Sequence, residues 1–237
     1  MGNLYIVATP IGNLKDITLR ALEILKSADL ILAEDTRVTK KLLSHYDISK
    51  LVWRFDENVK HQMFDKIRAE LTKGTNIALV TDAGTPGISD PGRWLNRKIV
   101  EWFDNSKTNS TTKLFDDSTV RIIPIPGPSA LSAIISASDV DLSEFIFSGF
   151  PPRKKGRQTF FKKISESEMP VIFFESPHRV EKAFLELEKN CPEGWLNVGR
   201  ELTKMHEEIW RGKVQDARSH FSGERARGEF VIILSNR

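Results

Sequence analysis

Residues 77–92 read IALVTDAGTPGISDPG, an apolar run followed at once by a loop rich in glycine and proline. A short run without polar residues is typical of a strand buried on both faces of a parallel sheet. The loop 81–92 then lies at the carboxyl end of that strand, where open α/β sheets bind their ligands. This stretch therefore predicts an α/β fold with a binding site after the strand.

The same pattern recurs through the first half of the chain. Further apolar runs predict strands at 4–8, 30–33, 51–55 and 120–125. Between them, Thr18 is expected to cap a helix that turns Leu19 inward, and a charged helix is expected within 57–73. Parallel strands joined by helical crossovers are the natural topology for this spacing.

Apolar runs continue in the second half, after an interruption. Two prolines and a glycine at 126–128 break the pattern, as expected at a domain boundary. The later runs predict strands at 145–150, 170–175, 195–200, 207–210 and 230–234. We therefore predict two α/β domains, residues 1–126 and 127–237. The polar stretch 104–118 is expected to be a surface loop.

Composition excludes several classes of protein. The chain has 237 residues, 40% of them hydrophobic and 28% charged, with a net charge of +3, all ordinary for a globular protein. A single cysteine, Cys191, cannot form a disulfide framework or a cysteine-rich zinc site, and the histidines lack metal-ligand spacing, so we expect no metal. No signal peptide or membrane-spanning run is evident, which predicts a cytoplasmic protein with no membrane segment.

Three loops rich in glycine and proline follow predicted strands. They lie at 9–14, 81–92 and 126–129. Gly84 and Gly87 allow the backbone to approach a ligand closely, and Asp82 and Asp90 offer acceptors for hydroxyl groups. Each loop alone is also explained as a tight turn. Their recurrence at strand ends favours a binding site.

Eight motifs occur in one order along nearly the whole chain. They are TPIGNL (9–14), AEDTR (33–37), TDAGTPGISDPG (81–92), PIPGPSA (124–130), GFPPRKKGR (149–157), FFESPHR (173–179), RELTK (200–204) and GEFVII (228–233). Together they resemble the tetrapyrrole methylase superfamily, in particular its small-subunit ribosomal RNA methyltransferase I family. The resemblance implies a class III methyltransferase fold, with a cofactor cleft between two α/β domains.

The resemblance also implies an activity and partners. Members of that family use S-adenosylmethionine to methylate the ribose 2′-hydroxyl of a cytidine in 16S ribosomal RNA. We therefore expect 16S ribosomal RNA or the small ribosomal subunit as partner, and a homodimer. Many members continue past the last predicted strand into a helical extension, whereas this chain ends at Arg237. The RNA contacts of that extension are expected to be dispensable or supplied otherwise.

The resemblance assigns a set of cofactor-binding residues. In the first domain and at the boundary they are Pro10, Asp82, Gly84, Thr85, Pro86, Ile88, Ser89, Ser129 and Ala130, and in the second domain they are Leu202 and Thr203. Backbone N–H groups near Gly84 are expected to receive the methionine carboxylate, and the apolar Ile88 is expected to flank the adenine.

Methyl transfer to a hydroxyl needs positioning, exclusion of water and removal of a proton, but no metal. The proton acceptor is a carboxylate, a histidine or a lysine with a lowered pKa. Residues of these types follow predicted strands, and we rank Lys204 first and His178 second. The remaining candidates for the catalytic set are Glu201, Asp35 and Arg37. A helix cap or a local salt bridge explains each of them equally well.

A basic run indicates a nucleic-acid partner. Residues 151–163 contain six cations and no acidic residue, and we expect phosphate contacts from Arg153, Lys154, Lys155 and Arg157. Phe160 or Phe161 either stacks on a base or, more simply, faces the core. Taken alone, a charge run is also explained as a solvated surface.

Two other functions remain open at this point. One is a methylase of a small anionic molecule such as a tetrapyrrole, which does not require so many exposed cations. The other is a non-enzymatic RNA-binding assembly factor, which does not require the glycine-proline loops. The basic run and the loops together favour a ribosomal RNA ribose methyltransferase.

Overall fold

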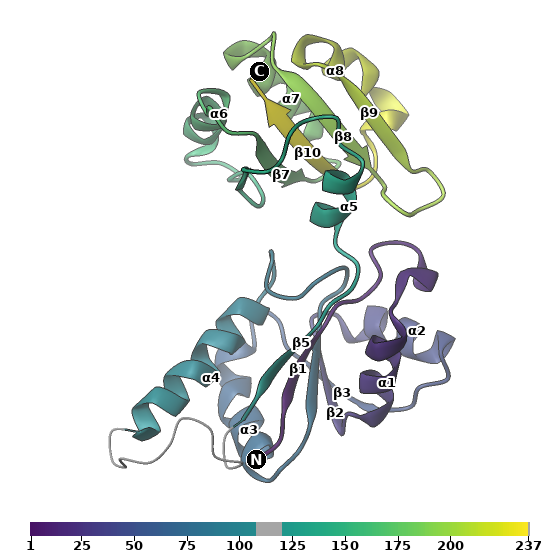
Figure 1. Cartoon of the computed structure of the whole chain (residues 1–237), viewed down its shortest axis with the longest axis vertical. Coiled ribbons are helices and arrows are strands. Elements are labelled where there is room, and N and C mark those ends of the chain that lie inside the picture. The colour runs from purple at the N-terminus through teal and green to yellow at the C-terminus, as the bar shows by residue number, and fades with distance from the viewer. Residues whose placement is uncertain (108–119, 237) are drawn as a thin grey trace. The chain divides into compact units, whose positions relative to one another are not determined.

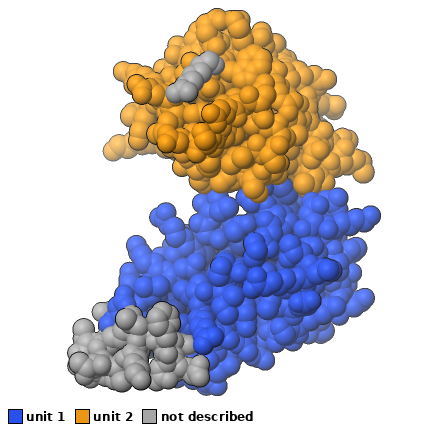
Figure 2. Space-filling model, in the orientation of Figure 1, with its two compact units in different colours: residues 1–129 blue, residues 130–237 orange. Residues whose placement is uncertain are grey.

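The chain is described here by a computed structural model that covers residues 1–107 and 120–236 (Figure 1). It divides into two compact units, Met1–Ser129 and Ala130–Arg237, coloured separately in Figure 2. The sequence prediction places the boundary slightly earlier, at 126/127. Each unit is built on its own sheet, and each is described separately below.

The first unit contains a five-stranded parallel sheet in the order β3-β2-β4-β1-β5. Its strands are β1 (Leu4–Val7), β2 (Leu30–Ala33), β3 (Leu51–Arg54), β4 (Ile77–Val80) and β5 (Ile122–Ile125). All residues of β2 and β4 are buried, because both strands lie inside the sheet with helices over both faces. Continuous apolar runs therefore became strands, as the sequence predicted.

Helices cover both faces of this sheet. They are α1 (Leu19–Ser27), α2 (Thr36–His45), α3 (Lys60–Thr72) and α4 (Gly92–Lys107), with a short 3-10 helix at Leu14–Asp16. Residues of α1 and α2 share one core with the sheet, and residues of α3 and α4 share another. Thr18 caps α1, since its hydroxyl accepts a hydrogen bond from the Ala21 N–H at 3.1 Å. The expectation that Leu19 points inward is wrong: as the first helical residue it is 79% exposed.

The predicted surface loop at 104–118 is only partly described. Helix α4 continues through Lys107, so the first residues of that stretch are helical rather than a loop. Residues 104–107 include no proline or glycine that would end the helix earlier. Residues 108–119 lie outside the described part of the chain.

The second unit contains a mixed five-stranded sheet in the order β6-β7-β10-β8-β9. Its strands are β6 (Ile146–Phe147), β7 (Val171–Glu175), β8 (Trp195–Arg200), β9 (Glu208–Lys213) and β10 (Phe230–Ser235). β6 pairs with β7 in parallel, and the other pairings are antiparallel. Strand β9 extends beyond the predicted 207–210 because it pairs with β8 along its whole length.

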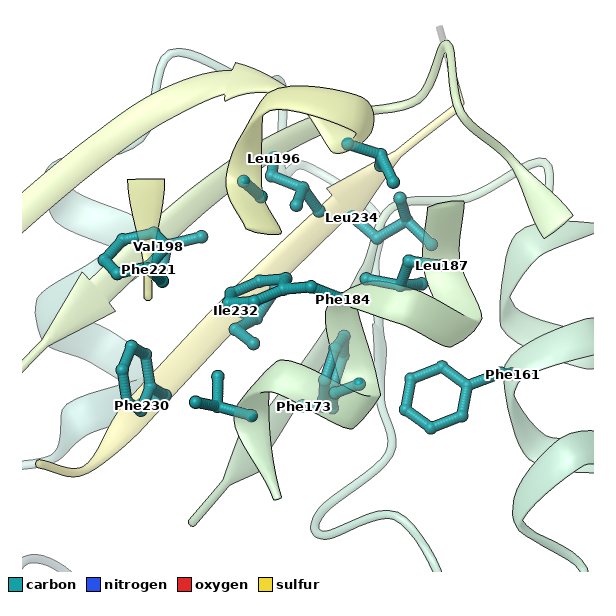
Figure 3. Packing of buried hydrophobic residues seen from close by; sticks show 14 of the residues in the cluster. Phe161, Phe173, Phe184, Leu187, Leu196, Val198, Phe221, Phe230, Ile232 and Leu234 are labelled. Carbon is teal, nitrogen blue, oxygen red and sulfur yellow. The ribbon is translucent and has the colours of Figure 1, made fainter. Parts of the chain in front are cut away.

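Three helices of the second unit pack an aromatic core against this sheet (Figure 3). They are α6 (Arg157–Ser165), α7 (Val180–Asn190) and α8 (Val214–His220), and the unit also contains α5 (Ala130–Ser136) and a 3-10 helix at Gly223–Ala226. Phe184 and Phe221 stack with ring centroids 5.4 Å apart. Phe161 is fully buried in this core and Phe160 packs against it, so both face the core rather than a nucleic acid.

Candidate active site

The three glycine-proline loops of the first unit meet at the carboxyl ends of neighbouring strands. Thr9, after β1, and Gly84, after β4, exchange two backbone hydrogen bonds of 2.9 and 3.0 Å. The Thr9 hydroxyl also donates to the Thr81 carbonyl at 3.1 Å. The Thr85 hydroxyl donates to the carbonyl of Pro128, which follows β5, at 3.1 Å. These contacts join the loops into one backbone cradle.

Gly84 lies at the centre of this cradle in a conformation that favours glycine. Its φ is +82°, and a Cβ atom there would lie 3.3 Å from Ile11 Cγ2 and 3.7 Å from the Pro128 carbonyl oxygen. Because the Gly84 N–H already donates to Thr9, any backbone donor for a methionine carboxylate must come from a neighbouring residue. Gly84 thus lets the loops after β1, β4 and β5 approach one another closely.

Asp90 shapes the second half of the same loop. Its carboxylate accepts hydrogen bonds from the Gly87 N–H, at 2.8 and 2.9 Å, and from the Gly92 N–H at 2.7 Å. Burial raises the pKa of Asp90, although these hydrogen bonds oppose the shift. The carboxylate that was expected to accept from a ligand hydroxyl is thus engaged within its own loop.

The loop after β2 joins the site through Glu34 and Asp35. The Thr81 hydroxyl donates to Glu34 Oε2 at 2.9 Å, and the Asp35 N–H donates to Asp82 Oδ1 at 2.9 Å. Burial raises the pKa of Glu34, and the charges of Asp82 and Asp90 add to the effect. Of the two neighbours Glu34 and Asp35, Glu34 is therefore the stronger base. Their adjacent positions in the sequence did not reveal this difference.

A pocket of about 540 Å³ opens beside these loops. The predicted cofactor residues Ile88 and Ser89 line it together with Glu34. Trp94, from the first turn of α4, also lines it; its ring meets His61 edge-on at 4.8 Å, with Lys60 Nζ 5.6 Å from the ring centroid. Sequence reasoning missed Trp94; the only signal was an aromatic residue placed directly after the loop.

The other predicted cofactor residues of the first unit occupy the same loops. Pro10 and Pro86 are buried, whereas Asp82 is exposed. Ser129 is the last residue of the first unit, and Ala130 begins α5 of the second. The structure thus gathers the first-unit set around one sheet edge.

Asp35 and Arg37 form a helix cap and a salt bridge. Asp35 accepts the Arg37 N–H at 2.8 Å at the start of α2 and pairs with the Arg37 guanidinium at 2.6 Å. The hydrogen bonds from Arg37 hold the pKa of Asp35 well below its usual range. This geometry matches the capping alternative, and a carboxylate with so low a pKa is a weak base.

A separate loop in the second unit, between β8 and β9, holds Glu201 to Lys204. Glu201 and Thr203 have φ values of +48° and +67°, which are strained for residues other than glycine. Lys204 Nζ lies 2.9 Å from Glu201 Oε1 and 2.9 Å from Glu229 Oε2. Leu202 is 8% exposed.

The ion pairs of this loop keep its lysine charged. Burial alone would lower the pKa of Lys204, but hydrogen bonds and charges from the two carboxylates outweigh it and raise that pKa. Burial would raise the pKa of Glu201, but Lys204 and the Glu229 N–H lower it overall. The lowered pKa that a lysine base requires is absent from this arrangement.

The remaining predicted residues flank β7 in the chain, with the cations 153–157 before it and His178 after it. His178 is exposed in the turn that connects β7 to α7. Arg153, Lys154 and Lys155 are exposed ahead of α6. Arg157, predicted with them, instead forms an ion pair with buried Glu175 at 2.9 Å and keeps only 12% of its side chain exposed.

Within the described residues, no group of three or more His, Cys, Asp and Glu side chains is placed to hold a metal ion. In the same part of the chain, no helix combines the length and the apolar character needed to cross a bilayer.

Residues 3–218 match the family described as Tetrapyrrole (Corrin/Porphyrin) Methylases, so the chain belongs to that family. Its fold resembles uroporphyrin-III-C-methyltransferase from Thermus thermophilus, with a TM-score of 0.65 and 15% identity over 100% of this chain and 95% of that one. It also resembles cobalt precorrin-4 methyltransferase, with a TM-score of 0.64 and 19% identity over 98% and 94% of the two chains.

Closer relatives narrow the assignment. The chain is 39% identical to the ribosomal RNA small subunit methyltransferase I of Thermotoga maritima, over 100% of both proteins. It is 40% identical to the protein of the same name from Synechocystis sp., over 99% of this chain and 79% of that one. Within the methylases, the chain is therefore a member of the ribosomal RNA small subunit methyltransferase I family. The predicted family and fold class are confirmed.

Proposed function

We propose that this protein uses S-adenosylmethionine to methylate the ribose 2′-hydroxyl of a cytidine in 16S ribosomal RNA. The observation that carries the proposal is the cradle in which the loops after β1, β4 and β5 converge around Gly84. A non-enzymatic RNA-binding factor would not need such a cradle. The names of the relatives at 39 to 40% identity support the same reaction class.

The shape of the cradle depends on Gly84, because a Cβ atom there would press on Ile11 and displace the loop that is proposed to hold the cofactor. S-adenosylmethionine supplies a methyl group on a sulfonium, which a nucleophilic oxygen displaces directly. In this proposal the cofactor is held by first-unit loop residues and by three residues of the second unit. They are Pro10, Asp82, Gly84, Thr85, Pro86, Ile88, Ser89, Ser129, Ala130, Leu202 and Thr203.

Removal of the hydroxyl proton requires a base, and the carboxylates of the site differ in strength. Glu34 has a raised pKa and lines the pocket, whereas the pKa of Asp35 is lowered by Arg37. We therefore favour Glu34 over Asp35 and Arg37 for this step. The charged state of Lys204 favours an orienting role, in which it holds Glu201, over proton acceptance. His178 remains a second candidate base.

The exposed cations ahead of α6 support RNA rather than a small anion as substrate. Arg153, Lys154 and Lys155 are consecutive and exposed, which suits the spaced phosphates of a nucleic-acid strand. Methylation of a small anion such as a tetrapyrrole, the reaction named for the more distant structural neighbours, would not need them. A ribosomal substrate also implies action in the cytoplasm.

The reaction is tested by incubating the protein with methyl-labelled S-adenosylmethionine and purified small ribosomal subunits. We expect label in 16S RNA at one cytidine, resistant to alkaline cleavage on its 3′ side because the 2′-hydroxyl is blocked. Naked 16S RNA in a parallel reaction shows whether the assembled subunit is needed. Label in a tetrapyrrole but not in RNA would support the small-anion alternative.

We also propose that the protein acts as a homodimer, as the family resemblance implies. Sedimentation at micromolar concentration is expected to give twice the chain mass of 26.9 kDa. A monomer mass under those conditions would contradict this part of the proposal.

A further inference from the structure

The second unit contains a fully buried carboxylate outside the site described above. Glu175 is the last residue of β7, and none of its side chain is exposed. Its Oε2 lies 2.9 Å from Arg157 Nη2, and its Oε1 lies 2.7 Å from Arg179 Nη2. The Ser176 N–H also donates to Oε1 at 2.8 Å. Two guanidinium groups and one backbone donor thus compensate for the burial of one charge.

The same two arginines bind the backbone of the preceding loop. Arg179 Nη1 donates to the Pro151 carbonyl at 3.1 Å, and Arg157 Nη1 donates to the Pro152 carbonyl at 3.4 Å. Proline has no N–H, so this stretch cannot form a two-sided ladder with a strand, and side-chain donors hold it instead. Arg157 also lies over the Phe161 ring, 4.9 Å from its centroid.

The anchored positions enclose the exposed cations. Pro151 and Pro152 precede Arg153, Lys154 and Lys155, and Arg157 follows them. Upstream, the Phe174 N–H donates to the Gly149 carbonyl at 2.8 Å. The cationic segment 153–155 is therefore held at both ends by contacts that converge on β7 and Glu175.

We propose that Glu175 is a positioning residue that, through Arg157 and Arg179, fixes segment 151–157 in the shape in which its exposed cations meet RNA phosphates. This inference rests on the proposed function. A segment that is ordered before binding loses less conformational entropy when it binds, so its phosphate contacts contribute more affinity. Arg157 belongs to this anchor and faces inward, whereas the cations at 153–155 face outward.

Glu175→Gln tests the inference, because it keeps the shape of the side chain while removing the charge between two guanidinium groups. We expect KM for small ribosomal subunits to rise about tenfold, because the loosened segment must be ordered on binding. kcat and the Kd for S-adenosylmethionine should stay within about twofold, since neither depends on this segment. Glu181→Gln, which removes an exposed carboxylate from the first turn of α7, is the matched control and should change nothing.

A double-mutant cycle separates positioning from a general loss of stability. In a protein that already carries Arg153→Ala, Lys154→Ala and Lys155→Ala, Glu175→Gln should raise KM no further, because no cations remain to be positioned. The same fold increase in both backgrounds would overturn the proposal. If Glu175→Gln does not fold, Arg157→Lys replaces it in the cycle, since the lysine keeps the positive charge of Arg157 but lacks the forked geometry of a guanidinium group.

Trypsin gives a readout that does not depend on RNA. The segment contains three consecutive trypsin sites. Cleavage of a native protein follows local opening, so loss of the anchor in Glu175→Gln should speed cleavage at 153–155 about tenfold or more. An unchanged cleavage rate would contradict the anchor itself. Faster cleavage in a protein whose parent form neither binds nor methylates RNA would contradict the proposed function and leave the anchor standing.

Discussion

At Gly84 the close packing of Ile11 and a φ of +82° act together, so a side chain there meets both steric conflict and backbone strain. Gly84→Val should weaken S-adenosylmethionine binding by about tenfold or more, because strain of roughly 1–2 kcal/mol and the new contact both displace the loop. Calorimetric titration measures the change in Kd.

Gly74 provides the matched control. Its φ is +95°, but a Cβ atom there would meet nothing within 4 Å. Gly74→Val should therefore cause a similar loss of stability through strain alone, with an unchanged cofactor Kd. If both folded variants bind the cofactor as tightly as the parent protein, the cofactor site lies away from the cradle.

Burial makes the ionised form of Glu34 costly in the folded protein, and its contribution to stability therefore depends on pH. Burial and the charges of Asp82 and Asp90 raise its pKa in the folded protein above the ordinary value of 4.5. The carboxyl group therefore favours the folded state most when it is protonated, below that ordinary pKa, and this contribution is lost as the pH rises through the raised pKa. An acid kept in this position despite its cost is consistent with a catalytic role.

Glu34→Gln should remove this pH dependence. At pH 7 the variant should be as stable as the parent protein or slightly more stable, and the advantage should vanish as the pH falls through the raised pKa. Urea unfolding at several pH values measures it. Methyl transfer should fall sharply in kcat if Glu34 is the base, whereas parental kcat in the stable variant would assign proton removal to another residue.

At the scale of elements, the sequence predicted what local pattern controls and missed what depends on distant partners. The strands β2 and β4 were predicted because buried parallel strands are continuously apolar. The antiparallel pairings of the second sheet were not predicted, since alternation and turn signals there do not identify the partner strand. The length of β9 depends on its pairing with β8, and no local signal marked its end.

In the candidate site, too, the sequence predicted what local pattern controls and missed what depends on distant partners. Glycine and proline mark the loops locally, so their residues were found, but the Thr9–Gly84 pairing depends on β1 and β4 being neighbours in the sheet. Arg157 was grouped with the exposed cations because its neighbours in sequence are basic. Its ion pair with Glu175 crosses from α6 to β7 and is invisible to a reading of adjacent residues.

The loop between β8 and β9 allows a test of what Lys204 does. If its charge holds Glu201 and Glu229, then Lys204→Arg should retain most of the methyl transfer, and Lys204→Met should lose it. Lys204→Met should also lose less than about 1 kcal/mol of stability, as expected for a partly exposed ion pair. Equal, near-complete loss of kcat in both variants would instead identify Lys204 as a proton acceptor.

The ion pairs of Lys204 with Glu201 and Glu229 also predict that stability depends on pH. The folded-state pKa of Lys204 is raised, so its contribution is fully present below the ordinary value of 10.5 and is lost as the pH rises through the raised value. The stability difference between the parent protein and Lys204→Met should therefore disappear in strongly alkaline solution. Thermal unfolding across that range measures it, and a constant difference would show that packing rather than charge sets the effect.

For the whole molecule, a net charge of +3 is too small to attract RNA by itself, so local concentration of charge must matter. The segment 153–155 places three exposed cations in succession, equal in number to the whole net charge. Binding of each phosphate releases condensed counterions, and the logarithm of affinity then falls linearly with the logarithm of salt concentration. The steepness of that line counts the contacts.

Replacing Arg153, Lys154 and Lys155 with alanine should therefore flatten the salt dependence of RNA binding by roughly 2 units, at about 0.7 per single-strand phosphate contact. KM for the small ribosomal subunit should rise while the cofactor Kd stays unchanged, because the cradle of the first unit is untouched. The matched control replaces Lys26, Lys40 and Lys41, which are exposed on α1 and α2, and lowers the net charge equally. If both triple variants change the slope alike, overall charge drives binding. If neither changes it, the segment is only a solvated surface, and methylation of a small anion becomes the better account of the protein.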